Sequence, residues 1–175
     1  MGSVSEGTGR VRLVVCDTGP VLHIREAGAL DLLAKTGEVL IPPAVNNELT
    51  ARIPHWTNAR PDWLRIGTLT AEDIRHARRC QAIGELGAGE AEAIALARSA
   101  RADWLLTDDA GARIVASLFG LEAHGSLGVV LWGAASGHLQ RAEAFAALEA
   151  LTRSSLWISP RILEEARQAL HRLVP

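Results

Sequence analysis

Five carboxylates in this sequence stand where acidic side chains can bind a divalent metal ion. Asp17 directly follows a β-branched run, and Asp108 and Asp109 directly follow a second apolar run. Glu48 lies one turn into a segment that opens with two prolines, and Glu90 opens an alanine-rich segment. Mg²⁺ and Mn²⁺ prefer oxygen ligands, and clustered carboxylates repel one another without a cation or a proton. This pattern indicates metal-dependent hydrolysis of a phosphodiester bond.

Each of these acids also has an ordinary structural explanation. Asp17 is suited to cap a helix that begins near residue 19, and either Asp108 or Asp109 can cap the helix that follows them. A cap needs only one acid, so the other is free for chemistry. Glu48 fits a solvated helix face, and Glu90 fits an acid favoured by the helix dipole. Position alone leaves both interpretations open for each residue.

The segments around these acids alternate between strands and helices. Apolar and β-branched runs predict strands over residues 12–16, 38–41 and 104–106, and shorter strands over 63–69 and 121–124. Turn and capping residues predict helices between and after them, over residues 19–27, 29–34, 44–51, 70–82, 90–100, 110–118, 127–136, 142–151 and 160–173, with 155–159 as a candidate extended segment. Such alternation favours parallel strands covered on both faces. We expect the α/β class, as a three-layer α/β/α sandwich with a central parallel sheet of four to five strands.

Length and composition predict one globular domain. The chain has 175 residues, of which 48% are hydrophobic, so residues 11–175 are expected to form a single domain. Residues 1–10 lack the hydrophobic stretch of a secretory signal and are expected to be a flexible leader. The longest apolar runs fall short of the roughly 18 residues that cross a bilayer. Cys16 and Cys80 fit no metal or redox spacing, which predicts buried, reduced thiols in a cytoplasmic protein.

The charge of the chain gives little general support for nucleic-acid binding. The net charge is −2 and the estimated pI is 6.3. Of the 18 basic residues, all but Lys35 are Arg, which suits bidentate phosphate contacts, although a high-GC genome produces the same bias. The basic residues at 75–79 fit a solvated helix face or a phosphate contact. With no Tyr and two Phe, a surface for base stacking would have to come from the five Trp.

Four ordered motifs resemble those of the PIN-domain family, in the branch of the VapC-like toxin ribonucleases and PIN-like bacterial and archaeal proteins. They are VVCDTGPVL (14–22), IPPAVNNEL (41–49), GAGEAEAIALA (87–97) and LLTDDAGAR (105–113). HGSLGVVLWGAASGHL (124–139) and LWIS (156–159) fit the same branch. The resemblance extends over about residues 12–172, and the order and spacing of the four motifs make it specific.

The resemblance assigns roles to the acids. It implies that Asp17, Glu48, Glu90 and Asp109 are the catalytic carboxylates and that they bind Mg²⁺ or Mn²⁺. Many members of the family have Asp at the position of Glu90, whose longer side chain would shift the metal. Asp108 occupies a variable position of the motif, and it is the alternative to Asp109 as the ligand.

The resemblance also implies supporting residues, a substrate and partners. Thr18 and Thr107 carry hydroxyls beside the acids and are expected to hydrogen-bond to them. Arg113 either contacts the nucleic-acid backbone or pairs with the acids when no metal is bound. The implied protein is a metal-dependent endoribonuclease that cleaves single-stranded RNA, as the toxin paired with a small antitoxin protein.

Other interpretations of the sequence remain. One is a nucleic-acid-binding or assembly module with a weak metal site, which the near-neutral charge favours. A phosphatase-like or sugar-nucleotide enzyme is disfavoured, because no glycine-rich phosphate loop follows the first strand. Apolar residues at helical spacing over 127–134 allow a homodimer, and burial in the core of the chain explains them equally well.

Overall fold

The β-branched and apolar runs form one parallel sheet in the computed structural model of the chain, which describes residues 10–174. The expected leader at residues 1–10 therefore lies, apart from Arg10, outside the described residues. The strands within this range have the order β3-β2-β1-β4-β5 and are β1 (Leu13–Cys16), β2 (Glu38–Ile41), β3 (Leu64–Ile66), β4 (Trp104–Leu106) and β5 (Ala123–His124). All four strand pairs are parallel, which confirms the predicted type of sheet.

The helices follow the predicted segments closely. They are α1 (Thr18–Glu26), α2 (Asp31–Thr36), α3 (Pro43–Arg52), α4 (Trp56–Ala59), α5 (Ala71–Gly84), α6 (Ala88–Ser99), α7 (Ala110–Leu118), α8 (Ser126–Ala135), α9 (Arg141–Thr152) and α10 (Pro160–Leu173). The sequence did not predict α4, because a single turn is too short to show a helical period. Burial of Trp56, which is 1% exposed, holds that turn against the core.

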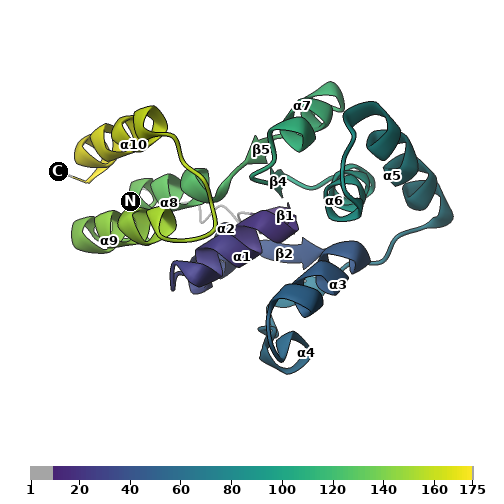
Figure 1. Cartoon of the computed structure of the whole chain (residues 1–175), viewed down its shortest axis with the longest axis horizontal. Coiled ribbons are helices and arrows are strands. Elements are labelled where there is room, and N and C mark those ends of the chain that lie inside the picture. Colours follow the sequence, from purple (N-terminus) through teal and green to yellow (C-terminus); the bar gives the residue numbers. More distant parts are fainter. Residues whose placement is uncertain (1–9, 175) are drawn as a thin grey trace, which may run out of the picture.

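Successive residues of each strand face opposite helical layers. On one face, Val14 and Cys16 pack with α1, α2, α3, α8 and α9. On the other face, Val15 packs with α5, α6 and α7. A third cluster joins α8, α9 and α10. Figure 1 shows α5, α6 and α7 on one side of the central strands and α1, α8 and α9 on the other. The three-layer α/β/α sandwich is therefore confirmed.

The central position of β1 determines where a ligand can bind. The chain runs from β1 outward through β2 to β3, and then returns to place β4 and β5 on the other side of β1. In parallel sheets the crevice at such a reversal, outside the carboxyl ends of the strands, is the usual binding position. Here the crevice lies between β1 and β4, where Cys16 pairs with Leu106 and the amide of Asp17 donates to the Leu106 carbonyl at 2.8 Å.

Two predictions from composition also have a counterpart in the fold. Cys16 and Cys80 are buried free thiols, and burial is the main cause that raises the pKa of each. No helix within residues 10–174 is long and apolar enough to cross a membrane.

The apolar residues of α8 pack within the chain itself. Val130 and Ala134 are buried, and Leu127 and Leu131 pack against the cluster that α8 forms with α9 and α10. Packing inside the chain thus accounts for their helical spacing. The homodimer remains a prediction.

Helix α5 packs along α6, the helix that carries Glu90. It begins with a capping box, in which the Thr70 hydroxyl accepts from the Asp73 amide at 3.2 Å and the Thr70 amide donates to the Asp73 carboxylate at 2.8 Å. Burial acts to raise the pKa of Asp73, but the hydrogen bonds from Thr70 outweigh it, and the pKa is lowered. The cap therefore stabilises the fold most when Asp73 is ionised.

We expect Thr70→Ala to lower the free energy of unfolding by about 1 kcal/mol near neutral pH, because the helix loses its cap. The pKa of Asp73 is depressed in the folded state, so its contribution is present above the unfolded pKa of about 3.9 and is lost as the pH falls through the folded value. The difference between wild type and variant should shrink below about pH 4. Urea unfolding near neutral pH and below about pH 4 measures this difference in the free energy of unfolding. Ser117→Ala, at an exposed helical position, is the control. A difference that is independent of pH would contradict this account.

Candidate functional site

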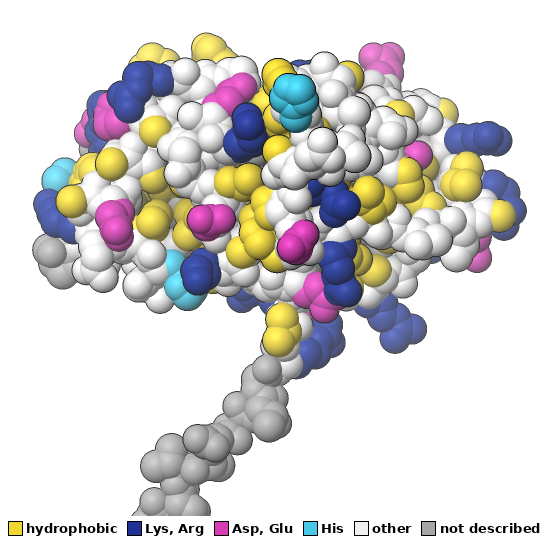
Figure 2. All heavy atoms as spheres, turned by 90° about the horizontal axis from the view of Figure 1, so that it is seen from below, with side chains coloured by type: hydrophobic (Ala, Val, Ile, Leu, Met, Phe, Trp, Pro, Cys, Tyr) yellow, Lys and Arg dark blue, Asp and Glu magenta, His cyan; other side chains and the backbone are white. Residues whose placement is uncertain are grey.

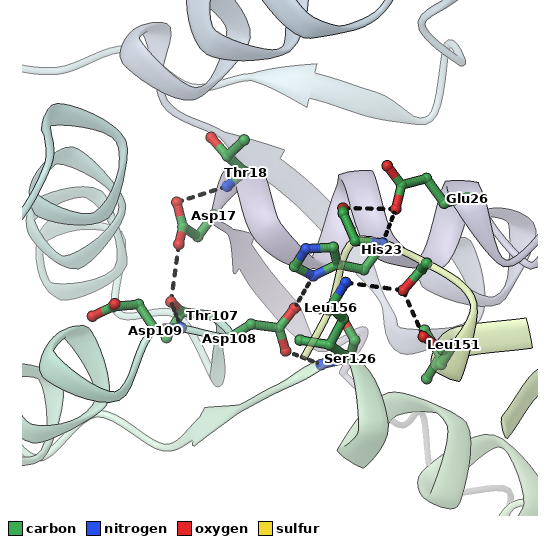
Figure 3. Close-up of polar contacts among 12 residues, drawn as sticks. Asp17, Thr18, His23, Glu26, Thr107, Asp108, Asp109, Ser126, Leu151 and Leu156 are labelled. Atoms are coloured by element: carbon green, nitrogen blue, oxygen red, sulfur yellow. Dashed lines mark hydrogen bonds and ion pairs between the residues drawn. The ribbon is translucent and has the colours of Figure 1, made fainter. Parts of the chain in front are cut away.

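Asp17 is fixed at the carboxyl end of β1 by the two chain segments beside it. Its side chain is buried, with the residue 4% exposed. One oxygen accepts from the Thr18 amide at 2.6 Å and the other from the Thr107 hydroxyl at 2.9 Å (Figure 3). Asp17 therefore does cap α1, as its structural interpretation requires. The same contacts hold its carboxylate between the ends of β1 and β4.

Glu48 is drawn into the protein and is not a solvated helix residue. It lies half-buried on α3, which packs against α6. The Thr18 hydroxyl donates to one of its oxygens, and the Gly89 amide donates to the other at 2.9 Å. A Cβ atom at position 89 would lie 2.7 Å from both oxygens. Glycine at this position therefore lets the Glu48 carboxylate reach the first turn of α6.

Glu90 and Glu92 begin α6 together but have different surroundings. Glu90 is half-buried and lines a cavity that it shares with Asp17 and Glu48. Burial, and then the charges of Asp109 and Glu48, raise the pKa of Glu90. Glu92 instead accepts from the amide of Ala44 in the first turn of α3, at 2.8 Å. Each of the helices α3 and α6 thus provides a carboxylate that accepts a hydrogen bond from a backbone amide in the first turn of the other helix.

Asp108 and Asp109 point in opposite directions from the end of β4 (Figure 3). Asp109 is exposed and caps α7, with its Oδ1 accepting from the Ala112 amide at 2.7 Å; among the described residues no donor is bonded to its Oδ2. Asp108 accepts from His23 Nδ1 at 2.7 Å and from the Ser126 amide and hydroxyl at 2.7 and 2.6 Å. Burial acts to raise the pKa of Asp108, but these hydrogen bonds outweigh it and lower the pKa.

The buried negative charge is concentrated at Asp17. Burial raises its pKa to about 7, against the opposing effect of the hydrogen bonds from Thr18 and Thr107. The charges of Glu90 and Glu48 contribute to the same increase. A group with these surroundings gains from a bound proton or a bound cation.

One cavity of about 370 Å³ at the switch point contains the predicted acids. It is lined by Asp17, Glu48, Glu90 and Asp109, together with Asp108, Arg52 and the segment 155–157. The structure thus brings together acids from the ends of two strands, from the first turn of α6 and from the middle of α3. Their number and oxygen chemistry suit a hard cation.

Arg113 lies beside this group rather than among the four acids. Its Nε donates to the Thr107 carbonyl at 3.1 Å, and a terminal nitrogen lies 4.0 Å from Asp108. This arrangement corresponds to the second of its two predicted roles, pairing with an acid of the site. About half of its side chain is exposed.

The carboxylates share a cavity without forming a closed cage. Within residues 10–174, no group of three or more His, Cys, Asp or Glu side chains is already arranged to hold a metal ion. Mg²⁺ is usually held directly by one or two carboxylates and keeps several water molecules, so separated carboxylates around a cavity with room for those waters suit it. The closed, four-ligand geometry of a structural zinc site is not what these residues provide.

Sequence reasoning missed several residues that line or support the cavity. Arg52 had a usable signal, since it lies four residues after Glu48 on the same helix and therefore on the same face. His23 and Ser126 had none, because they meet Asp108 only through contacts across 85 and 18 residues of sequence. The placement of Trp157 at the cavity depends likewise on the whole fold.

Comparison with known proteins identifies the fold independently. A family model described as a PIN domain matches residues 13–172 and includes all four motifs. No curated protein matches the chain significantly. PIN domains are nuclease-type folds that generally use divalent metal ions. The family match does not separate the VapC-like branch from others. It covers most of the chain, however, and the chain therefore belongs to the PIN-domain family.

Proposed function

We propose that this protein is a Mg²⁺- or Mn²⁺-dependent endoribonuclease that hydrolyses phosphodiester bonds of single-stranded RNA. The observation that carries the proposal is the single cavity between β1 and β4 that Asp17, Glu48, Glu90 and Asp109 line together. Burial and, after it, the charges of neighbouring acids raise the pKa of Asp17 and of Glu90, and a bound cation would offset both effects. Membership of a nuclease-type family supports the same chemistry.

The four acids have distinct parts in this proposal. The carboxylates of Asp17 and Glu48 are the most firmly positioned of the four, since Thr18 donates a hydrogen bond to each of them. Glu90 and Asp109 line the same cavity and have fewer partners among the described residues. A bound ion would supply Lewis acidity and an activated water, so no side-chain nucleophile is required.

We assign Asp108 a positioning role outside the ligand set. Both of its oxygens already accept hydrogen bonds, and its lowered pKa reflects those bonds. Through them it holds His23 and the start of α8 against the end of β4. Thr107 acts in the same way on Asp17, because its hydroxyl fixes the orientation of that carboxylate.

A module that binds nucleic acid without cleaving it is the second candidate. The net charge of −2 gives neither candidate general support, since proteins that bind nucleic acid mainly through charge are usually basic. The face shown in Figure 2 has acidic, basic and hydrophobic side chains interspersed, without a broad field of one sign. The two candidates differ in whether metal-dependent cleavage occurs.

We expect the wild-type protein to cleave single-stranded RNA when Mn²⁺ is added, and Asp17→Asn to lose more than about 100-fold of that activity, because loss of a ligand should exceed the effect of losing its supporting partner. Asp62→Asn is a matched control. It removes an exposed carboxylate that precedes β3, an edge strand of the sheet. Gel analysis of labelled RNA measures the rates. Equal cleavage by wild type and Asp17→Asn would contradict the catalytic proposal.

Gly89→Ala should weaken metal binding by about 10- to 100-fold while leaving the fold intact, because the new methyl group displaces the flexible Glu48 carboxylate that Gly89 supports. Titration of the melting temperature with Mn²⁺ measures the affinity, since an ion that binds the folded state stabilises it. Gly128→Ala is the control, because a Cβ there meets its nearest atom at an ordinary 3.6 Å. An unchanged Mn²⁺ response in Gly89→Ala would argue against Glu48 as a ligand.

The proposal extends to a role as the toxin of a toxin–antitoxin pair. The four-motif resemblance supports it, and the expected partner is a small protein that blocks the nuclease. We expect a short neighbouring reading frame for a DNA-binding protein, whose product co-purifies with this chain and inhibits its cleavage of RNA. A neighbouring protein that binds without inhibiting cleavage would contradict this role.

A further inference from the structure

Trp157 is the most exposed large hydrophobic side chain among the described residues. It is 82% exposed, whereas the next, Leu118, is 69% exposed. Burial of a large apolar side chain contributes roughly 1.5–3 kcal/mol to stability. Because Trp157 is exposed, it does not make this contribution to the stability of the fold. An exposed Trp beside a cavity is a stronger indication of a binding site than an exposed small aliphatic residue is.

The segment that carries Trp157 is held firmly in place. The amide and hydroxyl of Ser155 both donate to Glu26 on α1 at 2.7 Å. Leu156 and Ile158, on either side of Trp157, pack against the main hydrophobic cluster. Because its neighbours turn inward, the indole of Trp157 is left facing solvent. Its exposure is therefore a consequence of an ordered backbone.

Trp157 borders the same cavity as the acids. That cavity is also lined by Arg52, an exposed cation at the end of α3. One space thus joins an aromatic face, a guanidinium and the carboxylates that are proposed to hold a metal ion. A nucleotide has the complementary parts, a flat base and a charged phosphate.

We propose that Trp157 is the platform on which an unpaired base of the substrate stacks, with Arg52 contacting the adjoining phosphate. This inference rests on the proposed function and specifies its substrate class, because only an unpaired base offers a free face to the indole. A base, rather than a protein, is favoured as the occupant by the continuity of Trp157 with the acidic cavity. The charge pattern of the chain also leaves little general attraction for RNA, so stacking supplies a needed part of the affinity.

The test is RNA affinity measured by fluorescence anisotropy with short labelled strands, in Ca²⁺ to limit cleavage. Base stacking on an aromatic residue contributes about 1–3 kcal/mol, so Trp157→Ala should weaken binding of single-stranded RNA by about 5- to 150-fold. Trp157→Phe should restore most of the affinity, since it retains an aromatic face. Leu118→Ala, which removes another exposed apolar side chain, should bind like wild type.

A strand with abasic sites isolates the stacking contribution, because it keeps the phosphates and lacks the bases. Wild type and Trp157→Ala should bind it equally. Equal affinity of the two proteins for the intact strand would overturn the stacking proposal and assign the indole to a protein contact, while leaving the proposed nuclease function standing. Absence of both binding and cleavage of single-stranded RNA by wild type would overturn the two proposals together. Unchanged melting temperatures of the variants will show that folding is unaffected.

Discussion

The parallel pairing of β1 with β4 is the constraint on which the candidate site depends. It aligns Cys16 with Leu106, so that the residues after each strand leave the sheet side by side. The Asp17 amide continues the ladder to the Leu106 carbonyl, and the Thr107 hydroxyl then reaches the Asp17 carboxylate across 90 residues of sequence. A shift of this register by one residue would send these side chains to the other face of the sheet. The backbone hydrogen bonds between β1 and β4 thus determine which side chains meet at the cavity.

The cavity also shows how a fold can tolerate an unfavourable cluster of charge. Burial and neighbouring carboxylates raise the pKa of Asp17, and Glu90 is affected in the same direction. The surrounding structure compensates with directed donors: Thr18 serves two acids, Gly89 serves Glu48, and His23 with Ser126 satisfies Asp108. Thr18, Gly89 and Ser126 lie in first helical turns, where backbone amides are free, whereas His23 lies in the last turn of α1 and donates through its ring. Much of the order in the site therefore arises from ordinary helix capping.

Most of the fold was predictable because its elements are short and marked by local signals. Strand β2 and helices α7 and α10 have the predicted bounds, set by residues such as Pro160 and Gly120 that begin or stop them. The site was predictable only to the level of candidate acids. Asp108 and Asp109 follow the same strand, and the direction of Asp108 depends on His23, which lies 85 residues away in sequence. The same holds for Glu92, whose partner Ala44 lies 48 residues away.

The mutual capping of α3 and α6 has a mechanical consequence. Gly89 of α6 is tied to Glu48 of α3, and Ala44 of α3 is tied to Glu92 of α6, so two clamps of opposite direction each join the first turn of one helix to a carboxylate farther along the other. Neither helix can slide along the other without stretching one of the clamps. The pair is expected to behave as a rigid wall of the cavity. Any adjustment to the size of an incoming ion then falls to the part of the cavity outside this pair, where the exposed Asp109 caps α7.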